Sequence, residues 1–152
     1  MIDRIVVPTD GSEHAHAAAT DAIALAAAHD ATVCAIAVAD VGPFGGGRLP
    51  GEAGSAREVL GERAESFVRR VADRATEAGV EAETAVRTGP PGEEIVSYVE
   101  AVDADLVVMG TRGRGGLERL ALGSVTDHVV RFGSVRTLVV DADSGGDWST
   151  GE

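Results

Sequence analysis

Four residues with fixed spacing between positions 110 and 124 have the chemistry to hold a phosphate. Two residues separate Gly110 from Gly113, and nine residues separate Gly113 from the pair Gly123 and Ser124. A glycine has no Cβ, so backbone N–H groups beside it can approach an anion closely. A helix that begins at Gly123 and Ser124 presents unpaired N–H groups and the positive end of its dipole to the same anion. The spacing predicts a phosphate site, and a turn with an empty site is the alternative.

The Ser124 hydroxyl has two alternative roles in this motif. Ser124 and Asp127 match the capping-box pattern, in which the serine caps its own helix. The hydroxyl can instead meet a phosphate oxygen. Local charge favours an anion here, since residues 110–136 carry five Arg and two acids, a net of +3, while the whole chain has a net charge of −12.

Three other nucleotide motifs are excluded by the residues present. The chain contains no Lys, so a P-loop cannot be built. The dinucleotide fingerprint GxGxxG fails after the first expected strand, and it fails again from Gly113 because Glu118 stands at the third glycine position. A phospho-accepting receiver domain would need a lysine at a strand end, although Asp10 resembles part of its acidic cluster.

Alternating strand and helix patterns must position this motif. β-branched and apolar runs predict strands at residues 4–9, 32–38, 82–87, 105–109 and 136–140. Helical spacing predicts helices from Ser12 to about 28, from about 56 to 78, from the segment 88–94 to 102, and at 124–132. Such alternation predicts an α/β fold, a doubly wound parallel sheet with helices on both faces, and ligands bind such sheets at the carboxyl ends of the strands. No repeat or second domain is found.

Composition limits the function classes. Hydrophobic residues make up 44% of 152 residues, enough for one domain with a core. Acids outnumber bases by 25 to 13, and such a negative surface argues against nucleic acid as a partner. The acidic surface favours a salt-rich cytoplasm and a halophilic archaeal source. Codon bias is the alternative reason for the missing Lys. No apolar run is long enough to span a membrane and no signal peptide is found, so we expect a cytoplasmic protein. The single cysteine, Cys34, is expected to be buried and inert.

The motif G-x2-G-x9-G-[ST] resembles the hallmark of the universal stress protein family, in particular its ATP-binding branch. Residues 110–124 match it at every fixed position, and IVVPTDGSEHA, AIAVAD, TGPPGEEIV and SVRTLVV resemble other segments of the family. The resemblance covers roughly residues 1–141, which we expect to form one Rossmann-like, adenine-nucleotide-binding domain, with an acidic disordered tail at 142–152. It implies the strand order 3-2-1-4-5, ATP across the ends of the first and fourth strands, and a homodimer paired through the last strand, residues 136–140.

The resemblance also implies the site residues. Asp10 is expected near the ribose, and Val38 is expected to offer backbone contacts to adenine. The motif glycines are expected at the phosphates, and Arg112 or Arg114 is expected to reach one of them. Divalent metal, Mg²⁺ or Mn²⁺, would be held mostly by the phosphates. The complete expected set is Pro8, Thr9, Asp10, Val38, Met109, Gly110, Arg112, Gly113, Arg114, Gly123, Ser124 and Val125.

Several of these residues also have interpretations in which they contact no ligand. Asp10 could cap the first helix, and His14 and His16 are expected to be solvated. Glu93 and Glu94 are typical of a first helical turn and not of a catalytic pair. The glycine-rich segment 41–55 is either a linker or a lid.

Three functions follow for such a chain. The first is a nucleotide-binding stress-response or signalling module, favoured over an efficient enzyme because no nucleophile–base pair stands out. The second is a slow ATPase or self-phosphorylating protein, with Ser124, Thr111 or Thr126 as acceptors. The third is a nucleotide-free dimeric stress factor.

Overall fold

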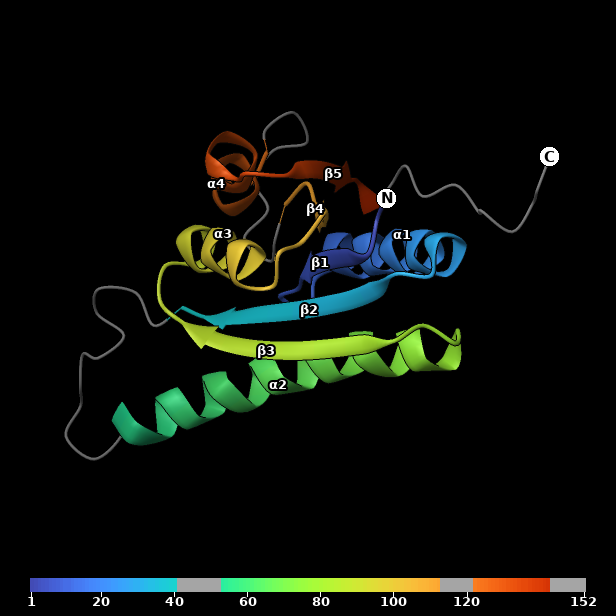
Figure 1. Ribbon diagram of the computed structural model, residues 1–152. Helices are drawn as coiled ribbons and strands as arrows, with labels where there is room; N and C mark the ends of the chain where they lie inside the picture. The colour runs from blue at the N-terminus through green and yellow to red at the C-terminus, as the bar shows by residue number, and fades with distance from the viewer. Residues whose placement is uncertain (41–52, 113–121, 143–152) are drawn as a thin grey trace.

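Five parallel strands form a single sheet in the computed structural model, which describes residues 1–40, 53–112 and 122–142, with backbone alone for 53–57. The strand order is β3-β2-β1-β4-β5, and all four pairings are parallel (Figure 1). The strands are β1 (Arg4–Pro8), β2 (Thr32–Ala39), β3 (Ala82–Thr88), β4 (Leu106–Gly110) and β5 (Arg136–Val140). The helices are α1 (Glu13–His29), α2 (Ala53–Glu77), α3 (Pro91–Ala101) and α4 (Ser124–Phe132). The predicted α/β fold and strand order are confirmed.

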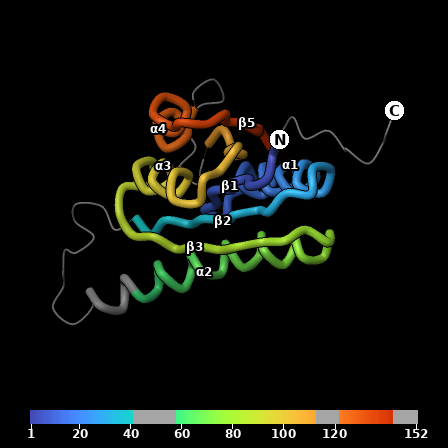
Figure 2. The backbone as a smooth tube through the Cα atoms, viewed as in Figure 1, coloured from blue at the N-terminus to red at the C-terminus, as the bar shows by residue number. Residues whose placement is uncertain are grey.

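Helices cover both faces of this sheet. On one face, α1 and α2 pack with β-strand side chains such as Ile5 and Val33 into one core cluster. On the other face, α3 and α4 pack with Val6, Ile36 and Val107 into a second cluster. Figure 2 shows α2 running along β3, and α3 beside α4. Successive residues of β1 and β2 therefore alternate between two buried faces, which is why these strands are almost continuously apolar.

Small residues let α1 lie close to the sheet. Its buried positions are mostly alanine, including Ala18, Ala19 and Ala22, which are fully buried. The Ser12 Oγ accepts a hydrogen bond from the Ala15 N–H at 3.2 Å, so Ser12 is the N-cap of α1. The helix ends at Asp30, whose φ of 56° is left-handed.

Several element boundaries differ from the sequence expectations by one to three residues. The helix expected from about residue 56 begins at Ala53, and residues 41–52 of the expected linker or lid lie outside the described residues. The fourth strand begins one residue later than expected, at Leu106. The Asp105 carboxylate instead accepts hydrogen bonds from the backbone N–H groups of Asp3 and Arg4, at 2.8 and 3.0 Å. These bonds favour the charged carboxylate and lower the pKa of Asp105.

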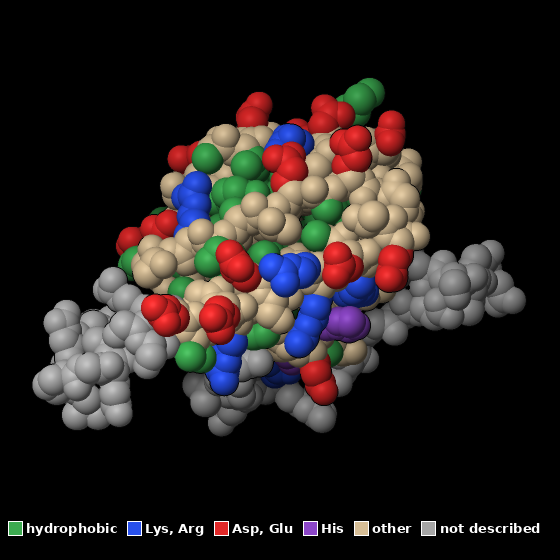
Figure 3. All heavy atoms as spheres, turned by 90° about the horizontal axis from the view of Figure 1, so that it is seen from below, with side chains coloured by type: hydrophobic (Ala, Val, Ile, Leu, Met, Phe, Trp, Pro, Cys, Tyr) green, Lys and Arg blue, Asp and Glu red, His purple; other side chains and the backbone are tan. Residues whose placement is uncertain are grey.

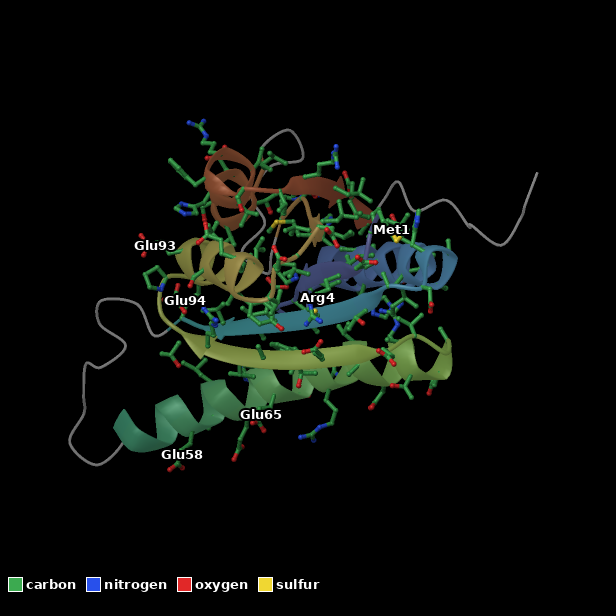
Figure 4. The ribbon with its side chains drawn as sticks, viewed as in Figure 1. Met1, Arg4, Glu58, Glu65, Glu93 and Glu94 are labelled. Carbon is green, nitrogen blue, oxygen red and sulfur yellow. The ribbon has the colours of Figure 1, made fainter. Side chains whose placement is uncertain are left out.

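Cys34 lies in the middle of β2 and is fully buried, as expected. Burial raises the pKa of its thiol, with the nearby Arg4 acting in the opposite direction. Arg4 reaches from β1 across the sheet and donates a hydrogen bond to Glu83 of β3 (Figure 4). The thiol is therefore held in its protonated, unreactive form.

Acidic and arginine side chains are interspersed over the face seen from the α2 side (Figure 3). On α2, Glu65 and Arg69 lie one turn apart, 4.0 Å from each other. Glu58 and Glu65 point away from the sheet (Figure 4). This face therefore presents no continuous basic surface. Among the described residues, no helix is long and apolar enough to cross a membrane.

Candidate functional site

The predicted site residues of the sheet lie on β1, β2 and β4, and β1 and β4 are neighbours at its centre. From β1 the chain winds in one direction through β2 and β3, and then in the other through β4 and β5. The winding therefore reverses between β1 and β4, whose carboxyl ends lie at the same edge of a parallel sheet. Pro8 and Thr9 stand at the end of β1, and Met109 and Gly110 at the end of β4. Doubly wound folds bind their ligands in this position.

The turn after β1 is held by its own side chains. The Thr9 Oγ1 accepts a hydrogen bond from the Gly11 N–H at 3.2 Å, and the Asp10 Oδ1 accepts one from the Ser12 N–H at 3.0 Å. Gly11 has a φ of +78°, and a Cβ there would lie 2.5 Å from the Phe67 ring of α2. Ser12, and not Asp10, caps α1. Asp10 instead holds the turn that leads into the helix.

Two hydrogen bonds join the ends of the glycine motif. The Gly123 N–H donates to the Thr111 carbonyl oxygen at 2.7 Å. The Thr126 Oγ1 donates to the Gly110 carbonyl oxygen at 2.8 Å, and Thr126 is only 3% exposed. The first turn of α4 is therefore pinned to the end of β4, although a dozen residues separate them in sequence. The buried Thr126 hydroxyl serves this contact, which makes it unsuited as a phosphate acceptor.

The capping box, one of the two alternative roles of Ser124, does not form. Gly123 occupies the N-cap position of α4, with φ −62° and ψ 154°, and Ser124 is the first helical residue. No side chain caps the helix, whereas Ser12 caps α1. Asp127, the other half of the expected box, lies 3.0 Å from the Arg131 side chain. The start of α4 therefore keeps backbone N–H groups that no side-chain cap satisfies, beside an exposed Ser124 hydroxyl.

The apolar members of the predicted site contribute backbone more than side chain. The Met109 side chain is 4% exposed and belongs to the core cluster under α3 and α4. Val38 and Val125 are partly buried against the same cluster. Their side chains help to fix the positions of β2, β4 and α4, and those of Val38 and Val125 stay partly exposed.

His14 is not solvated, contrary to the sequence expectation. Its side chain is 15% exposed, and the Ala142 N–H donates a hydrogen bond to its Nδ1 at 3.0 Å. The Arg112 Nη2 lies 3.1 Å from its Nε2. A Cβ on Gly110 would come within 2.6 Å of the His14 Cβ, so the missing side chain of Gly110 makes room for α1. Sequence reasoning missed this contact because it joins residues about a hundred positions apart.

Arg112 is the one predicted phosphate arginine within the described residues. Its side chain is 9% exposed, and its Nη2 lies 4.0 Å from the Asp141 Oδ1. Gly113 and Arg114 lie outside the described residues.

Other polar candidates have local partners away from the site. Glu94 lies 3.7 Å from Arg87, and Glu93 is exposed beside it at the start of α3 (Figure 4). His16 faces Arg74 of α2 at 3.4 Å, and burial followed by the charge of Arg74 lowers the pKa of His16. Within the described ranges, no three His, Cys, Asp or Glu side chains are grouped so that they could hold a metal ion.

Known proteins are similar to this chain over almost its whole length. The sequence model of the universal stress protein family matches residues 1–141. Universal stress protein MJ0531 of Methanocaldococcus jannaschii is 43% identical over 140 residues, which is 92% of this chain and 82% of that protein.

Two solved structures are also similar. The hypothetical protein MJ0577, whose structure served to assign its biochemical function, has a TM-score of 0.82 at 27% identity, over 93% of this chain and 96% of that one. A universal stress protein in complex with cAMP has a TM-score of 0.65 at 28% identity, over 93% of this chain and 98% of that one.

Proposed function

The chain belongs to the universal stress protein family, and we propose that it is an adenine-nucleotide-binding module of that family, with ATP as its ligand, whose occupancy signals stress. The cAMP held by a similar structure supports an adenine nucleotide as the class of ligand. The proposal does not require hydrolysis of the nucleotide.

The pinning of α4 to β4 carries this proposal. The bonds from Gly123 to Thr111 and from Thr126 to Gly110 bring the start of α4 to the end of β4, where the winding reverses. The uncapped start of α4 lies there, and unsatisfied N–H groups at a helix start are a favourable partner for phosphate oxygens. The residues present therefore fit an anionic ligand at this edge.

The roles of the site residues follow from their positions. Ser124 and the backbone of Gly123 and Val125 would hold phosphate, with Gly113 and Arg114 on the intervening segment. The ends of β1 and β4 would border the nucleoside, with Asp10 toward the ribose and the Val38 backbone toward adenine. A bound nucleotide would bring Mg²⁺ or Mn²⁺ on its own phosphates.

We also infer that the protein is a homodimer paired through β5. β5 is an edge of the sheet, and its Leu138 is 39% exposed. Val130 and Phe132 of the neighbouring α4 are 48% and 65% exposed. An apolar edge strand is a favourable surface for a second copy. Light scattering of wild-type protein and of Leu138→Arg tests this, and a wild-type monomer would exclude it.

Mass spectrometry on freshly purified protein tests the proposed ligand. Native and denaturing spectra should differ by the mass of an adenine nucleotide, and titration of the stripped protein with ATP should restore the complex. Gly123→Val should abolish binding, because its side chain would occupy the place of the phosphate. Its φ and ψ lie in the extended region that valine adopts readily, so the fold should survive.

Gly61→Val is the matched control for that substitution. Gly61 lies in α2, where an added Cβ meets nothing within 4 Å. The control should bind ATP like the wild type. Unchanged ATP affinity in folded Gly123→Val would exclude the site.

A further inference from the structure

The strand β3 forms the edge of the sheet opposite to β5. In the part of the chain that the structure describes, only β2 pairs with it. Ala82 belongs to the core cluster with α2, so the alternate residues Thr84 and Val86 point to that face of the sheet as well. The helix α2 packs against both β2 and β3 (Figure 2), yet Thr84 and Val86 remain exposed. The outer edge of β3 is therefore open, and such an edge is a template for another strand.

Hydrogen bonds to β2 show which backbone groups of β3 face this open edge. The Val33 N–H donates to the Glu81 carbonyl oxygen at 2.9 Å, and the Gly89 N–H donates to the Ala39 carbonyl oxygen at 3.4 Å. Odd-numbered residues along β3 therefore direct their N–H and C=O groups towards β2. Because the direction alternates along a strand, the even-numbered residues of 82–88 direct theirs outward.

The side chains of β3 are self-complementary about Ala85. When two copies of β3 run antiparallel around a two-fold axis at Ala85, Glu83 of each lies opposite Arg87 of the other. Thr84 then lies opposite Val86 of the other copy, and their outward backbone groups exchange hydrogen bonds. Glu83 and Arg87 occupy a non-hydrogen-bonded pair, where facing side chains are closest. Like charges at these positions would oppose the pairing, whereas opposite charges stabilise it.

Charges on the α3 side of β3 extend this complementarity. Arg4 donates a hydrogen bond to Glu83, and the Arg87 Nη1 lies 3.7 Å from the Glu94 Oε1 beside the end of β3 (Figure 4). Glu83 and Arg87 are still 52% and 29% exposed, so each can meet a further charge. Across the two-fold axis the charges alternate in sign. These four residues sum to zero on a chain of net charge −12, so two copies approach here with little repulsion.

We propose that the open edge of β3 binds a second copy of this chain, as an antiparallel pair of β3 strands centred on Ala85. This pairing requires neither a nucleotide nor the pairing proposed through β5. A copy that uses both edges joins two neighbours, so the pairs extend into a row of copies. A single pair of short strands is a small interface, and the association therefore depends on protein concentration.

Sedimentation of the Leu138→Arg variant over a concentration series isolates this pairing, because the new arginine blocks the β5 edge. At about 0.1 M NaCl, charges more than about 10 Å apart are screened. We expect an equilibrium between monomer and dimer under these conditions. Thr84→Pro in that background should abolish the dimer, because it removes an outward N–H and leaves the hydrogen bonds to β2 intact. Circular dichroism checks that the variant is folded.

Charge reversal in the Leu138→Arg background tests the register. Glu83→Arg alone places two positive charges opposite each other, and Arg87→Glu alone places two negative charges there. Each should weaken dimerisation about tenfold or more. A mixture of the two variants should recover most of the lost affinity, because both facing positions then carry opposite charges. A loss of intramolecular ion pairs alone gives no such recovery.

Asp127→Arg and Arg131→Glu are the matched controls for these reversals. The two residues form an exposed ion pair on α4, which contacts β5 at the opposite side of the sheet. Each control variant, alone or mixed with the other, should dimerise like the Leu138→Arg parent.

Three results would overturn the proposal. One is a Leu138→Arg protein that stays monomeric at every concentration, whatever the wild type does through β5. Another is undiminished dimerisation of folded Thr84→Pro, which would place the contact on a different surface. The third is a mixture of the two charge variants that dimerises no better than either alone. Failure to bind ATP would exclude the proposed function and leave the pairing through β3 unaffected.

Discussion

Packing alone favours glycine at position 110, whether or not a ligand binds beside it. An added Cβ would lie 2.6 Å from the His14 Cβ and 2.8 Å from the His14 carbonyl carbon. Because backbone cannot give way easily, we expect Gly110→Ala to lower the free energy of unfolding by about 1–3 kcal/mol. Urea denaturation of the ligand-free protein measures this.

Gly61→Ala provides the opposite expectation for the same substitution. Gly61 lies in α2 with open space around it, so alanine should raise the free energy of unfolding by about 0.5–1 kcal/mol. If Gly110→Ala and Gly61→Ala had the same free energy of unfolding, the close approach of α1 to β4 would not constrain position 110.

Tyr98 makes the free energy of unfolding depend on pH in the alkaline range. Burial raises the pKa of Tyr98 to about 12 in the folded protein, from 10.0 in the unfolded chain, and at alkaline pH the Cys34 thiolate and the Glu83 carboxylate act in the same direction. The neutral phenol is therefore favoured by folding. Its contribution is complete below pH 10 and is lost as the pH rises from 10 towards 12. Tyr98→Phe should flatten the fall in the free energy of unfolding over this interval, by at most about 2–3 kcal/mol. Parallel curves for the two proteins would contradict this assignment.

Two serines at the starts of helices have different functions. Ser12 caps α1, and Ser124 follows the N-cap of α4. Ser12→Ala should lower the free energy of unfolding by about 1 kcal/mol. Ser124→Ala should change stability by less than about 0.5 kcal/mol and should weaken ATP binding. Thermal unfolding without ligand, together with calorimetry, distinguishes the two, and equal losses of stability would mean that Ser124 is a cap after all.

The elements themselves are largely predictable from sequence. Apolar runs bounded by Gly, Asp and Pro locate all five strands, and the strand–helix alternation predicts a parallel sheet. Boundaries are less certain because they depend on tertiary contacts, such as those of the Asp105 carboxylate with the backbone of Asp3 and Arg4 just before β4.

The site is predictable only where its signal is local. The spacing of Gly110, Gly123 and Ser124 predicts the motif for which we propose phosphate binding, since that chemistry depends on neighbouring backbone groups. Thr126 and His14 act across distances that no local pattern encodes. The hydroxyl of Thr126 holds β4, and the ring of His14 lies among residues that follow β4 and β5.

The charge of the whole molecule makes its stability depend on salt. The net charge is −12, and both acids and arginines are spread over the surface in Figure 3. Salt shortens the screening length from about 10 Å at 0.1 M to about 3 Å at 1 M, which reduces self-repulsion in the folded state. We expect the Tm at pH 7 to rise by several degrees as NaCl increases over this range.

A measurement at pH 5, close to the sequence pI of about 4.6, is the control. The net charge is small there, so the same addition of salt should raise the Tm much less. An equal rise at both pH values would show that salt acts through apolar burial instead.

Cys34 is the single cysteine of the chain and is fully buried, so its labelling rate reports how often the sheet around it opens. A thiol-alkylating reagent can reach this one sulfur only when β2 separates from its neighbours, so the rate of labelling counts opening events without any introduced probe. A ligand that binds only the closed form must slow that rate by a factor of one plus its concentration divided by its Kd. The labelling rate at a series of ATP concentrations therefore yields the affinity of the proposed site from an atom that never touches it.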